Sequence, residues 1–216
     1  MRPDAILFDC DGVIADSEGI ASRIMAEEIT ALGWPMTPVE EQRLFVGKPV
    51  SAMHGILVPR VGPLPEGWYP RILARIVAAM ETELTPIPGV MDVLYCFRDV
   101  GLPMAVASNS SRSELETKVR RLGLGAFFPG RMFSHEDVGA PKPAPDLYLA
   151  AAAACGVAPS RCVVVEDTPT GAAAGIAAGC RVLGYAPHFM PGLAETGALI
   201  FRDMAELPGL LGLTPA

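Results

Sequence analysis

The stretch AILFDCDGVIADSE, residues 5–18, runs from four apolar residues into two aspartates and a glycine. The apolar run 5–8 is typical of a strand buried on both faces, as in a parallel sheet. Asp9 and Asp11 follow directly, and two carboxylates so close together repel each other unless a cation, a shared proton or open water offsets their charge. The stretch therefore predicts a parallel sheet whose first strand ends at a site that needs such a partner.

Further strands of the same kind are expected along the chain, separated by helical patterns. Apolar runs lie at 103–107, 162–165 and 181–185, with a weaker run at 131–133. Between them, Ser111 and Glu114 form a capping-box pattern, and the segments 146–154 and 170–178 are rich in alanine. Strands that alternate with helices predict an α/β fold, a doubly wound parallel sheet of the Rossmann-like kind.

The segment from about 17 to 85 differs from the rest of the chain. It has helical periodicity at 17–32, 38–45, 49–57 and 68–84, and no convincing strand. We therefore expect an α/β core made of residues 1–15 and 86–216, with an α-helical cap of residues 16–85 inserted after the first strand.

The composition argues against several classes of protein. Half of the 216 residues are hydrophobic, which allows a substantial core. The net charge of −7 disfavours a sequence-independent nucleic-acid binder, because such a protein needs a basic face. The aspartates within the N-terminal apolar stretch argue against a signal peptide, and no run of 18 apolar residues predicts a membrane span.

The cysteines indicate a reducing compartment. There are five of them, an odd number, and no two have C-x-x-C spacing, which argues against a disulfide framework and a zinc site. We therefore expect reduced thiols in a cytoplasmic protein, with Cys10 as a packing residue at a strand end. The oligomeric state is not indicated by any of these patterns.

Polar side chains follow the predicted strand ends, and in a parallel sheet these ends share one edge. The set is Asp9 and Asp11, Ser108 and Asn109, Glu166 and Asp167, and Lys142 in the loop after 131–133. Mg²⁺ would offset the repulsion of the acids, because it prefers oxygen ligands and also binds phosphate oxygens. The lysine, the hydroxyl and the amide would hold an anion, so the set indicates phosphoryl transfer, with one aspartate as nucleophile and the other as acid and base.

Four segments carry a resemblance to a known family: FDCDGVIADSE (8–18), ASNSS (107–111), GAPKPAPDLY (139–148) and VVVEDTPTGAAAGIAAG (163–179). In this order the chain resembles the haloacid dehalogenase (HAD) superfamily, in the phosphatase and β-phosphoglucomutase-like branch that has a helical cap after the first motif. The resemblance implies that Asp9 is the nucleophile and a metal ligand. It implies that Asp11 is the general acid and base, whose backbone carbonyl also reaches the metal, and that Lys142 stabilises the charge of the nucleophile and the phosphoryl group.

The same resemblance assigns the remaining positions. Ser108, with Asn109 beside it, would bind the transferring phosphoryl group. Asp167 would bind Mg²⁺, and Glu166 would be either a ligand or an acid behind the ligands. Thr168 stands where the family commonly has serine, so the hydroxyl is kept.

The cap sequence favours a phosphatase over a mutase. Relatives of β-phosphoglucomutase carry a histidine ten residues after the second aspartate and an arginine three residues beyond a cap glycine, whereas this chain has Ala21 and Val50 there. The predicted function is therefore a Mg²⁺-dependent phosphatase acting on a small phosphorylated metabolite, a sugar phosphate or a phosphoglycolate-like compound. A mutase stays open as the alternative, as do a phospho-accepting receiver and a binding-only relative.

One cap residue is a candidate for substrate recognition. Lys48 lies in the loop FVGKPVSAM, residues 45–53, which links two predicted cap helices. In this branch such a loop faces the catalytic aspartates when the cap closes, so we expect Lys48 to contact the substrate away from the phosphoryl group. A surface lysine in solvent is the other interpretation, and the physiological substrate stays open.

Overall fold

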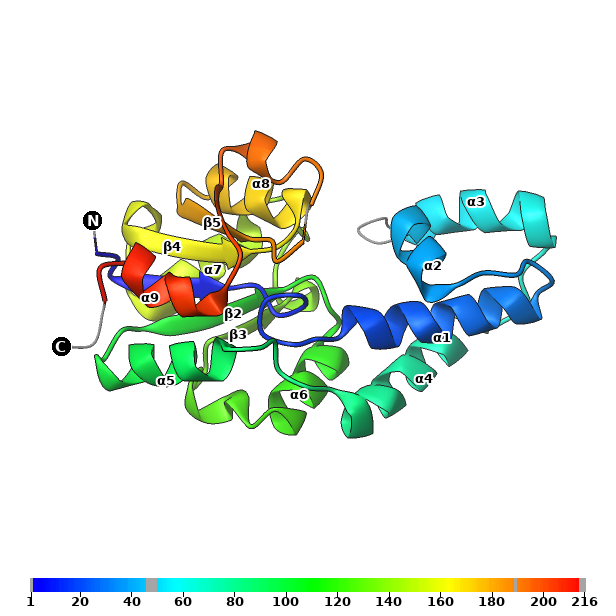
Figure 1. Cartoon of the computed structure of the whole chain (residues 1–216), viewed down its shortest axis with the longest axis horizontal. Helices are drawn as coiled ribbons and strands as arrows, with labels where there is room; N and C mark the ends of the chain where they lie inside the picture. The colour runs from blue at the N-terminus through cyan, green and yellow to red at the C-terminus, as the bar shows by residue number, and fades with distance from the viewer. Residues whose placement is uncertain (1, 46–49, 189, 214–216) are drawn as a thin grey trace. The chain divides into compact units, whose positions relative to one another are not determined.

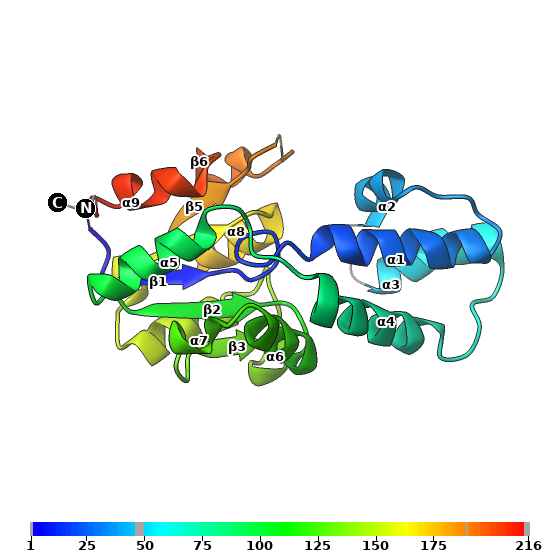
Figure 2. The same ribbon diagram turned by 60° about the horizontal axis from the view of Figure 1, so that its bottom comes forward.

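A computed structural model describes residues 2–45, 50–188 and 190–213 of the chain (Figures 1 and 2). Its contacts divide the chain into two compact units. One comprises Met1–Asp16 with Thr85–Ala216, and the other is Ser17–Leu84. The chain thus leaves the first unit after its first strand and returns to it at Thr85.

The first unit contains a sheet of six parallel strands, in the order β3-β2-β1-β4-β5-β6. The strands are β1 (Ala5–Phe8), β2 (Met104–Ser108), β3 (Met132–Ser134), β4 (Cys162–Glu166), β5 (Arg181–Tyr185) and β6 (Leu199–Phe201). The predicted α/β fold with a doubly wound parallel sheet is confirmed. The apolar runs do not predict β6, because it has only three residues and begins with an exposed leucine.

Helices cover the sheet on both faces (Figures 1 and 2). They are α5 (Val90–Asp99), α6 (Arg112–Arg121), α7 (Asp146–Cys155), α8 (Pro169–Ala177) and the short α9 (Leu207–Leu210). Successive strand residues point to opposite faces. Accordingly, Leu7 belongs to the core that includes residues of α7 and α8, whereas the Phe8 ring stacks on Phe97 of α5 with 6.4 Å between centroids.

Small residues let α8 lie close to the sheet. A β-carbon on Gly175 would come within 2.9 Å of Val182 Cγ2 and 3.2 Å of Val164 Cγ1. Ala172 and Ala174 of the same helix are fully buried. The alanine-rich composition therefore serves close packing as well as helix propensity.

The second unit consists of helices α1 (Glu18–Ala31), α2 (Pro38–Phe45), α3 (Val50–Val61) and α4 (Trp68–Glu83). Ile24 of α1 and Ile72 and Ile76 of α4 are buried in it. On its surface Arg23 pairs with Glu83 at 2.6 Å. Helix α3 ends at Val61, later than the predicted 57, and so contains Pro59. In the described part of the chain, no helix is long and apolar enough to cross a membrane.

The loop after β1 is fixed by its own backbone and by the returning chain. The Gly12 N–H donates to Ala15 O at 3.0 Å, and Gly12 has a φ of 71°, which favours glycine. The Ile87 N–H donates to Ile14 O at 2.9 Å, so the segment after Thr85 lies alongside this loop. The loop that holds Asp9 and Asp11 is therefore a tight turn anchored at both ends.

The strand order reverses direction between β1 and β4, with β2 and β3 on one side and β5 and β6 on the other. In open α/β sheets, ligands bind beyond the carboxyl ends of the strands at such a switch point. Asp9 follows β1 directly, and Glu166 is the last residue of β4. The topology thus places these two acids at the position where this fold forms its sites.

Candidate active site

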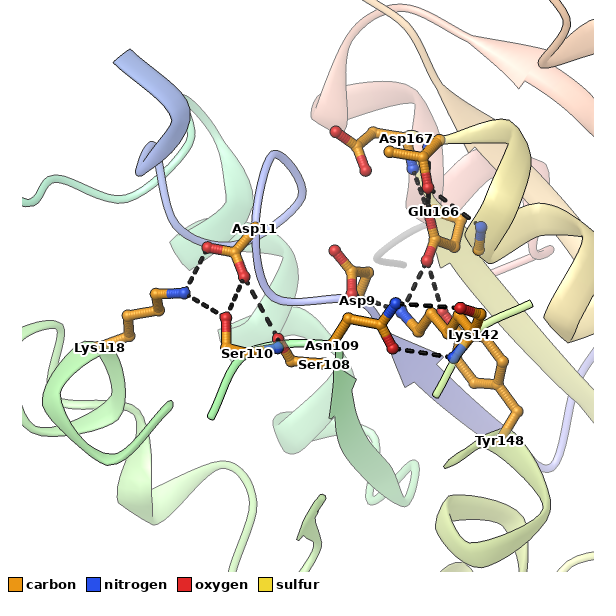
Figure 3. A network of polar contacts seen from close by, with 12 residues as sticks. Asp9, Asp11, Ser108, Asn109, Ser110, Lys118, Lys142, Tyr148, Glu166 and Asp167 are labelled. Carbon is orange, nitrogen blue, oxygen red and sulfur yellow. Dashed lines mark hydrogen bonds and ion pairs between the residues drawn. The ribbon is translucent and has the colours of Figure 1, made fainter. Parts of the chain in front are cut away.

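The carboxyl ends of β1, β2 and β4 bring a network of polar side chains together (Figure 3). The residues predicted from the sequence that lie in this network are Asp9, Asp11, Ser108, Asn109, Lys142, Glu166 and Asp167. All of them belong to the first compact unit. The network has two parts, one centred on the Lys142 ammonium and one on the Asp11 carboxylate.

Lys142 lies between two carboxylates. Its Nζ is 2.5 Å from Asp9 Oδ1 and 2.7 Å from Glu166 Oε1, and it lies 4.7 Å from the centroid of the Tyr148 ring. The side chains of Lys142, Asp9 and Glu166 are at least nine-tenths buried. Buried charges are stable only when they are paired, so this lysine neutralises part of the negative charge that the motif concentrates here.

Burial and charge shift the pKa values of this pair in the same direction. Desolvation raises the pKa of Asp9 to about 7, with Lys142 opposing the shift and Glu166 adding to it. Burial alone would lower the pKa of Lys142, but the neighbouring Asp9 and Glu166 carboxylates outweigh it and raise that pKa above its ordinary value. Lys142 is therefore held as a cation beside Asp9.

Glu166 is saturated by donors from the protein. Its Oε1 accepts from Lys142 and from the Tyr148 hydroxyl at 2.9 Å, and its Oε2 accepts from Asp167 N at 3.0 Å and from Thr168 N and Oγ1 at 3.1 and 3.0 Å. A carboxylate has about four lone-pair sites, so these five contacts use all of its capacity to accept hydrogen bonds. A β-carbon on Gly171 would lie 1.6 Å from Glu166 Oε1, which explains the glycine at that position of α8. Glu166 thus anchors Lys142 and the turn after β4.

Three acids lie close enough together to form a metal site, with the Glu166 oxygens already bonded to donors from the protein. Oxygen atoms of Asp9, Glu166 and Asp167 all lie within 4.8 Å of one another, and all three residues are buried. A β-carbon on Gly12 would lie 1.9 Å from Asp167 Oδ2. The Asp167 carboxylate therefore fits against the turn after β1 only because residue 12 is a glycine. An all-oxygen, anionic set of this kind suits a hard cation such as Mg²⁺.

Ser108 and Asn109 occupy different parts of the network. Ser108 is fully buried at the end of β2, where its hydroxyl donates to Asp11 Oδ2 at 3.2 Å and accepts from Ser110 N at 3.0 Å. The Asn109 amide instead bonds the backbone of Lys142, accepting from its N–H at 2.9 Å and donating to its carbonyl at 3.3 Å. The Asn109 side chain therefore fixes the loop that carries Lys142.

The Asp11 carboxylate has two partners that the sequence analysis did not identify. Lys118 Nζ lies 2.5 Å from Asp11 Oδ1, and the Ser110 hydroxyl lies 2.8 Å from Asp11 Oδ2 (Figure 3). The ammonium also donates to Ser110 Oγ at 2.7 Å. Burial alone would lower the pKa of Lys118, but Asp11, with Cys10 and Glu114 adding to its effect, raises that pKa above its ordinary value.

A local signal for Lys118 does exist in the sequence. Leu115 and Val119 form the buried face of α6, and Lys118 is three residues after the first and next to the second. Residues three and four apart share a helix face. A lysine on that face must find an acid, but the pattern does not say which.

The remaining predicted residues lie apart from this network or outside the described part of the chain. Lys48 is not among the described residues, so its expected contact with substrate stays a prediction. Cys10 is fully buried between the two aspartates, and burial raises the pKa of its thiol. It is the packing residue that was expected at the strand end.

Comparisons with known proteins agree with the motifs. A family model described as haloacid dehalogenase-like hydrolase matches residues 3–179. The 6-phosphogluconate phosphatase of Escherichia coli (strain K12) is 31% identical over 218 residues, covering 97% of this chain and 95% of the relative. A crystal structure of a HAD family hydrolase from Deinococcus radiodurans R1 with bound phosphate and sodium is 35% identical, with a TM-score of 0.85 over 100% of this chain and 99% of that one.

A mutase-like structure is also similar. The crystal structure of a putative β-phosphoglucomutase from Thermotoga maritima is 26% identical, with a TM-score of 0.81 over 100% of both chains. The resemblance predicted from the four motifs is thereby confirmed. This chain belongs to the haloacid dehalogenase-like hydrolases and is an enzyme of their phosphatase kind.

Proposed function

We propose that this enzyme is a Mg²⁺-dependent phosphatase that hydrolyses a small phosphorylated metabolite through an aspartyl-phosphate intermediate on Asp9. The observation that carries the proposal is the buried Lys142 ammonium 2.5 Å from Asp9 Oδ1, next to the acids Glu166 and Asp167. Such a lysine opposes the effect of burial, favours the ionised form of the nucleophile and reduces its repulsion of an incoming phosphate. The same lysine would then stabilise negative charge on the transferring group.

In the first step, an Asp9 carboxylate oxygen forms a bond to phosphorus while the bond from phosphorus to the leaving oxygen breaks. Asp11 gives a proton to that oxygen, which leaves as an alcohol. The Ser108 hydroxyl, at the end of β2, donates to Asp11 Oδ2 and would orient the phosphoryl oxygens. The products of this step are phosphorylated Asp9, ionised Asp11 and the free alcohol.

In the second step, a water oxygen forms a bond to the same phosphorus and the bond to Asp9 breaks. Asp11 takes a proton from this water, which restores its acid form and releases inorganic phosphate. Asp9 and Asp167, with the Asp11 backbone carbonyl, would hold Mg²⁺, and Glu166 would orient the residues around it. When bound, the ion supplies positive charge that offsets the carboxylates and the transferring phosphoryl group.

The substrate class is inferred from the relatives. The E. coli relative acts on a phosphorylated sugar acid, and this chain spans nearly its whole length. We therefore assign the present enzyme to sugar phosphates or phosphoglycolate-like compounds. The helical unit Ser17–Leu84 is proposed to be the cap that selects among them.

The test is release of inorganic phosphate from a panel of phosphorylated sugars, phosphorylated sugar acids and phosphoglycolate. Phosphate should appear with Mg²⁺ and not with excess EDTA, and the preferred compound should come from this panel. Failure to release phosphate from any of these compounds and from 4-nitrophenyl phosphate would overturn the phosphatase proposal.

A phosphomutase is the second candidate, because the mutase-like structure matches this chain over its full length. Ala21 and Val50 stand where the mutase resemblance calls for histidine and arginine, so we expect hydrolysis. With β-glucose-1-phosphate as substrate, the enzyme should release inorganic phosphate, if it acts, and form no glucose-6-phosphate. Efficient formation of glucose-6-phosphate would identify a mutase instead.

A further inference from the structure

Lysine is rare in this chain, and two of its lysines pair with the two motif aspartates. Of the 17 lysine and arginine residues, only Lys48, Lys118 and Lys142 are lysines. Lys142 and Lys118 are both almost fully buried, with side chains 3% and 1% exposed, and each has its ammonium 2.5 Å from one of the two motif aspartates. The proposed mechanism uses Lys142 but gives Lys118 no task.

Lys118 and Ser110 close a ring of contacts on Asp11. The ammonium lies 2.5 Å from Asp11 Oδ1 and 2.7 Å from Ser110 Oγ, and that hydroxyl donates to Asp11 Oδ2 at 2.8 Å. Both carboxylate oxygens are therefore held from one side by groups of α6 and of the turn after β2. Figure 3 shows the Asp11 side chain directed toward this pair, with Lys142 on the side of Asp9.

The ring adds to the Ser108 contact with Asp11 Oδ2 and fixes the orientation of the Asp11 side chain. Asp11 stands in a turn that continues into Gly12, and its side chain is 31% exposed, so packing alone leaves it room. Lys118 lies on a helix and is almost fully buried, which makes it a rigid support. General acid catalysis requires the acid within hydrogen-bond reach of the leaving oxygen, so fixed orientation matters most in that step.

We propose that Lys118, acting together with Ser110, is a positioning residue that sets the orientation of the Asp11 carboxyl group for proton transfer to the leaving oxygen. This rests on the proposed function, in which Asp11 is the general acid. The alternative is an ion pair that only stabilises the fold. The two differ in how activity depends on the leaving group.

The test compares two substrates of similar size, 4-nitrophenyl phosphate and phenyl phosphate, in the presence of Mg²⁺. Nitrophenolate is a stable anion that leaves without a proton, whereas phenolate departs faster when an acid protonates it. General acid catalysis typically contributes about 10²- to 10⁴-fold, so losing the orientation of the acid should affect phenyl phosphate much more. The measured quantity is the ratio of kcat/KM for the nitrophenyl compound to kcat/KM for the phenyl compound.

Lys118→Met removes the ammonium and keeps an unbranched side chain. Its ratio should rise about tenfold or more above that of the wild-type enzyme. Arg121→Met is the matched control, because Arg121 is an exposed cation on the same helix, and its ratio should not change. A Lys118→Met enzyme that loses the same factor on both substrates would overturn the proposal.

Ser110 supplies a second variant in case Lys118→Met does not fold. Ser110→Ala removes the hydroxyl that bridges the ammonium and Asp11, so it should raise the ratio by a smaller factor. Ser110→Thr keeps the hydroxyl and should restore the wild-type ratio. An unchanged ratio in Ser110→Ala would count against the proposal.

Asp11→Asn separates this proposal from the function on which it rests. If its ratio rises and that of Lys118→Met does not, Asp11 is the acid and Lys118 is not its positioning residue. If the ratio of Asp11→Asn stays at the wild-type value, the acid role of Asp11 fails, and the role of Lys118 fails with it.

Discussion

Gly12 lies so close to Asp167 that a β-carbon at position 12 would come within 1.9 Å of Asp167 Oδ2. The two residues belong to the turns after β1 and β4, which the parallel sheet places side by side. The bend after the aspartate pair therefore does more than reverse the chain. It places the Gly12 backbone directly against the Asp167 carboxylate, which is proposed to bind the metal.

Gly12→Ala should damage the metal site more than the fold. The new methyl group would displace the Asp167 carboxylate, so the enzyme should need at least about tenfold more Mg²⁺ for half-maximal activity, which is about 1.4 kcal/mol. Gly130→Ala is the control, because Gly130 has a similar φ of 68° and a β-carbon there would have no neighbouring atom within 4 Å. Both variants should lose about 1–2 kcal/mol of stability from the left-handed backbone. An unchanged Mg²⁺ requirement in Gly12→Ala would contradict the assignment of Asp167.

Asp9→Asn should remove turnover and leave the fold intact. The amide is the same size as the carboxylate but cannot attack phosphorus, so we expect a loss of at least about 100-fold, or about 2.7 kcal/mol in the barrier. Wild-type enzyme quenched in acid during turnover of a ³²P-labelled substrate should carry the label on the peptide that contains Asp9. Asp92→Asn, which changes an exposed acid on α5, should retain both activity and label. Activity of Asp9→Asn within tenfold of the wild type would exclude Asp9 as the nucleophile.

Removal of the metal should stop the enzyme. Excess EDTA should abolish phosphate release, and added Mg²⁺ should restore it, because the buried acids Asp9, Glu166 and Asp167 then regain a counter-charge. Excess Ca²⁺ should inhibit, since its longer bonds and more variable coordination misplace the nucleophile. Phosphate release at the full rate in EDTA would rule out the metal-dependent mechanism.

Cys10 should be unreactive in the folded protein although it lies between two catalytic candidates. The thiolate is the reactive form, and burial raises the pKa of this thiol, with the Asp11 charge adding to the shift. A short pulse of iodoacetamide at neutral pH, read by mass spectrometry, should label the partly exposed Cys96 before Cys10. All five cysteines should become labelled in denaturant. Rapid labelling of native Cys10 would show that the turn after β1 opens readily.

Much of the site could be predicted because a parallel sheet converts sequence position into spatial position. Asp9, Ser108 and Glu166 stand at or next to the carboxyl ends of three adjacent strands, so recognising the strands is enough to bring these residues together. Which group each side chain contacts within the site could not be predicted. That the Asn109 amide holds the Lys142 backbone depends on loop geometry, which the motif does not encode.

The contact between Lys118 and Asp11 shows a different limit. Six of the ten residues of α6 are charged, a composition typical of an exposed helix, and only the placement of Leu115 and Val119 marks Lys118 as buried. Its partner lies 107 residues earlier in the chain. Local periodicity can therefore indicate that a lysine is buried, whereas the identity of the acid depends on how α6 packs beside the sheet.

Substrate recognition by the helical unit gives the last prediction, and it concerns Lys48. This residue falls between α2 and α3 in the sequence, outside the described residues, so the prediction rests on the sequence. If Lys48 contacts the part of the substrate away from the phosphoryl group, Lys48→Ala should lower kcat/KM for the preferred panel compound by about tenfold or more, or about 1.4 kcal/mol. The small 4-nitrophenyl phosphate offers no such anionic or hydroxylated group, so its kcat/KM should change little. Arg71→Ala, which removes an exposed cation from α4, should leave both values unchanged. Equal losses on the two substrates in Lys48→Ala would remove Lys48 from the specificity site.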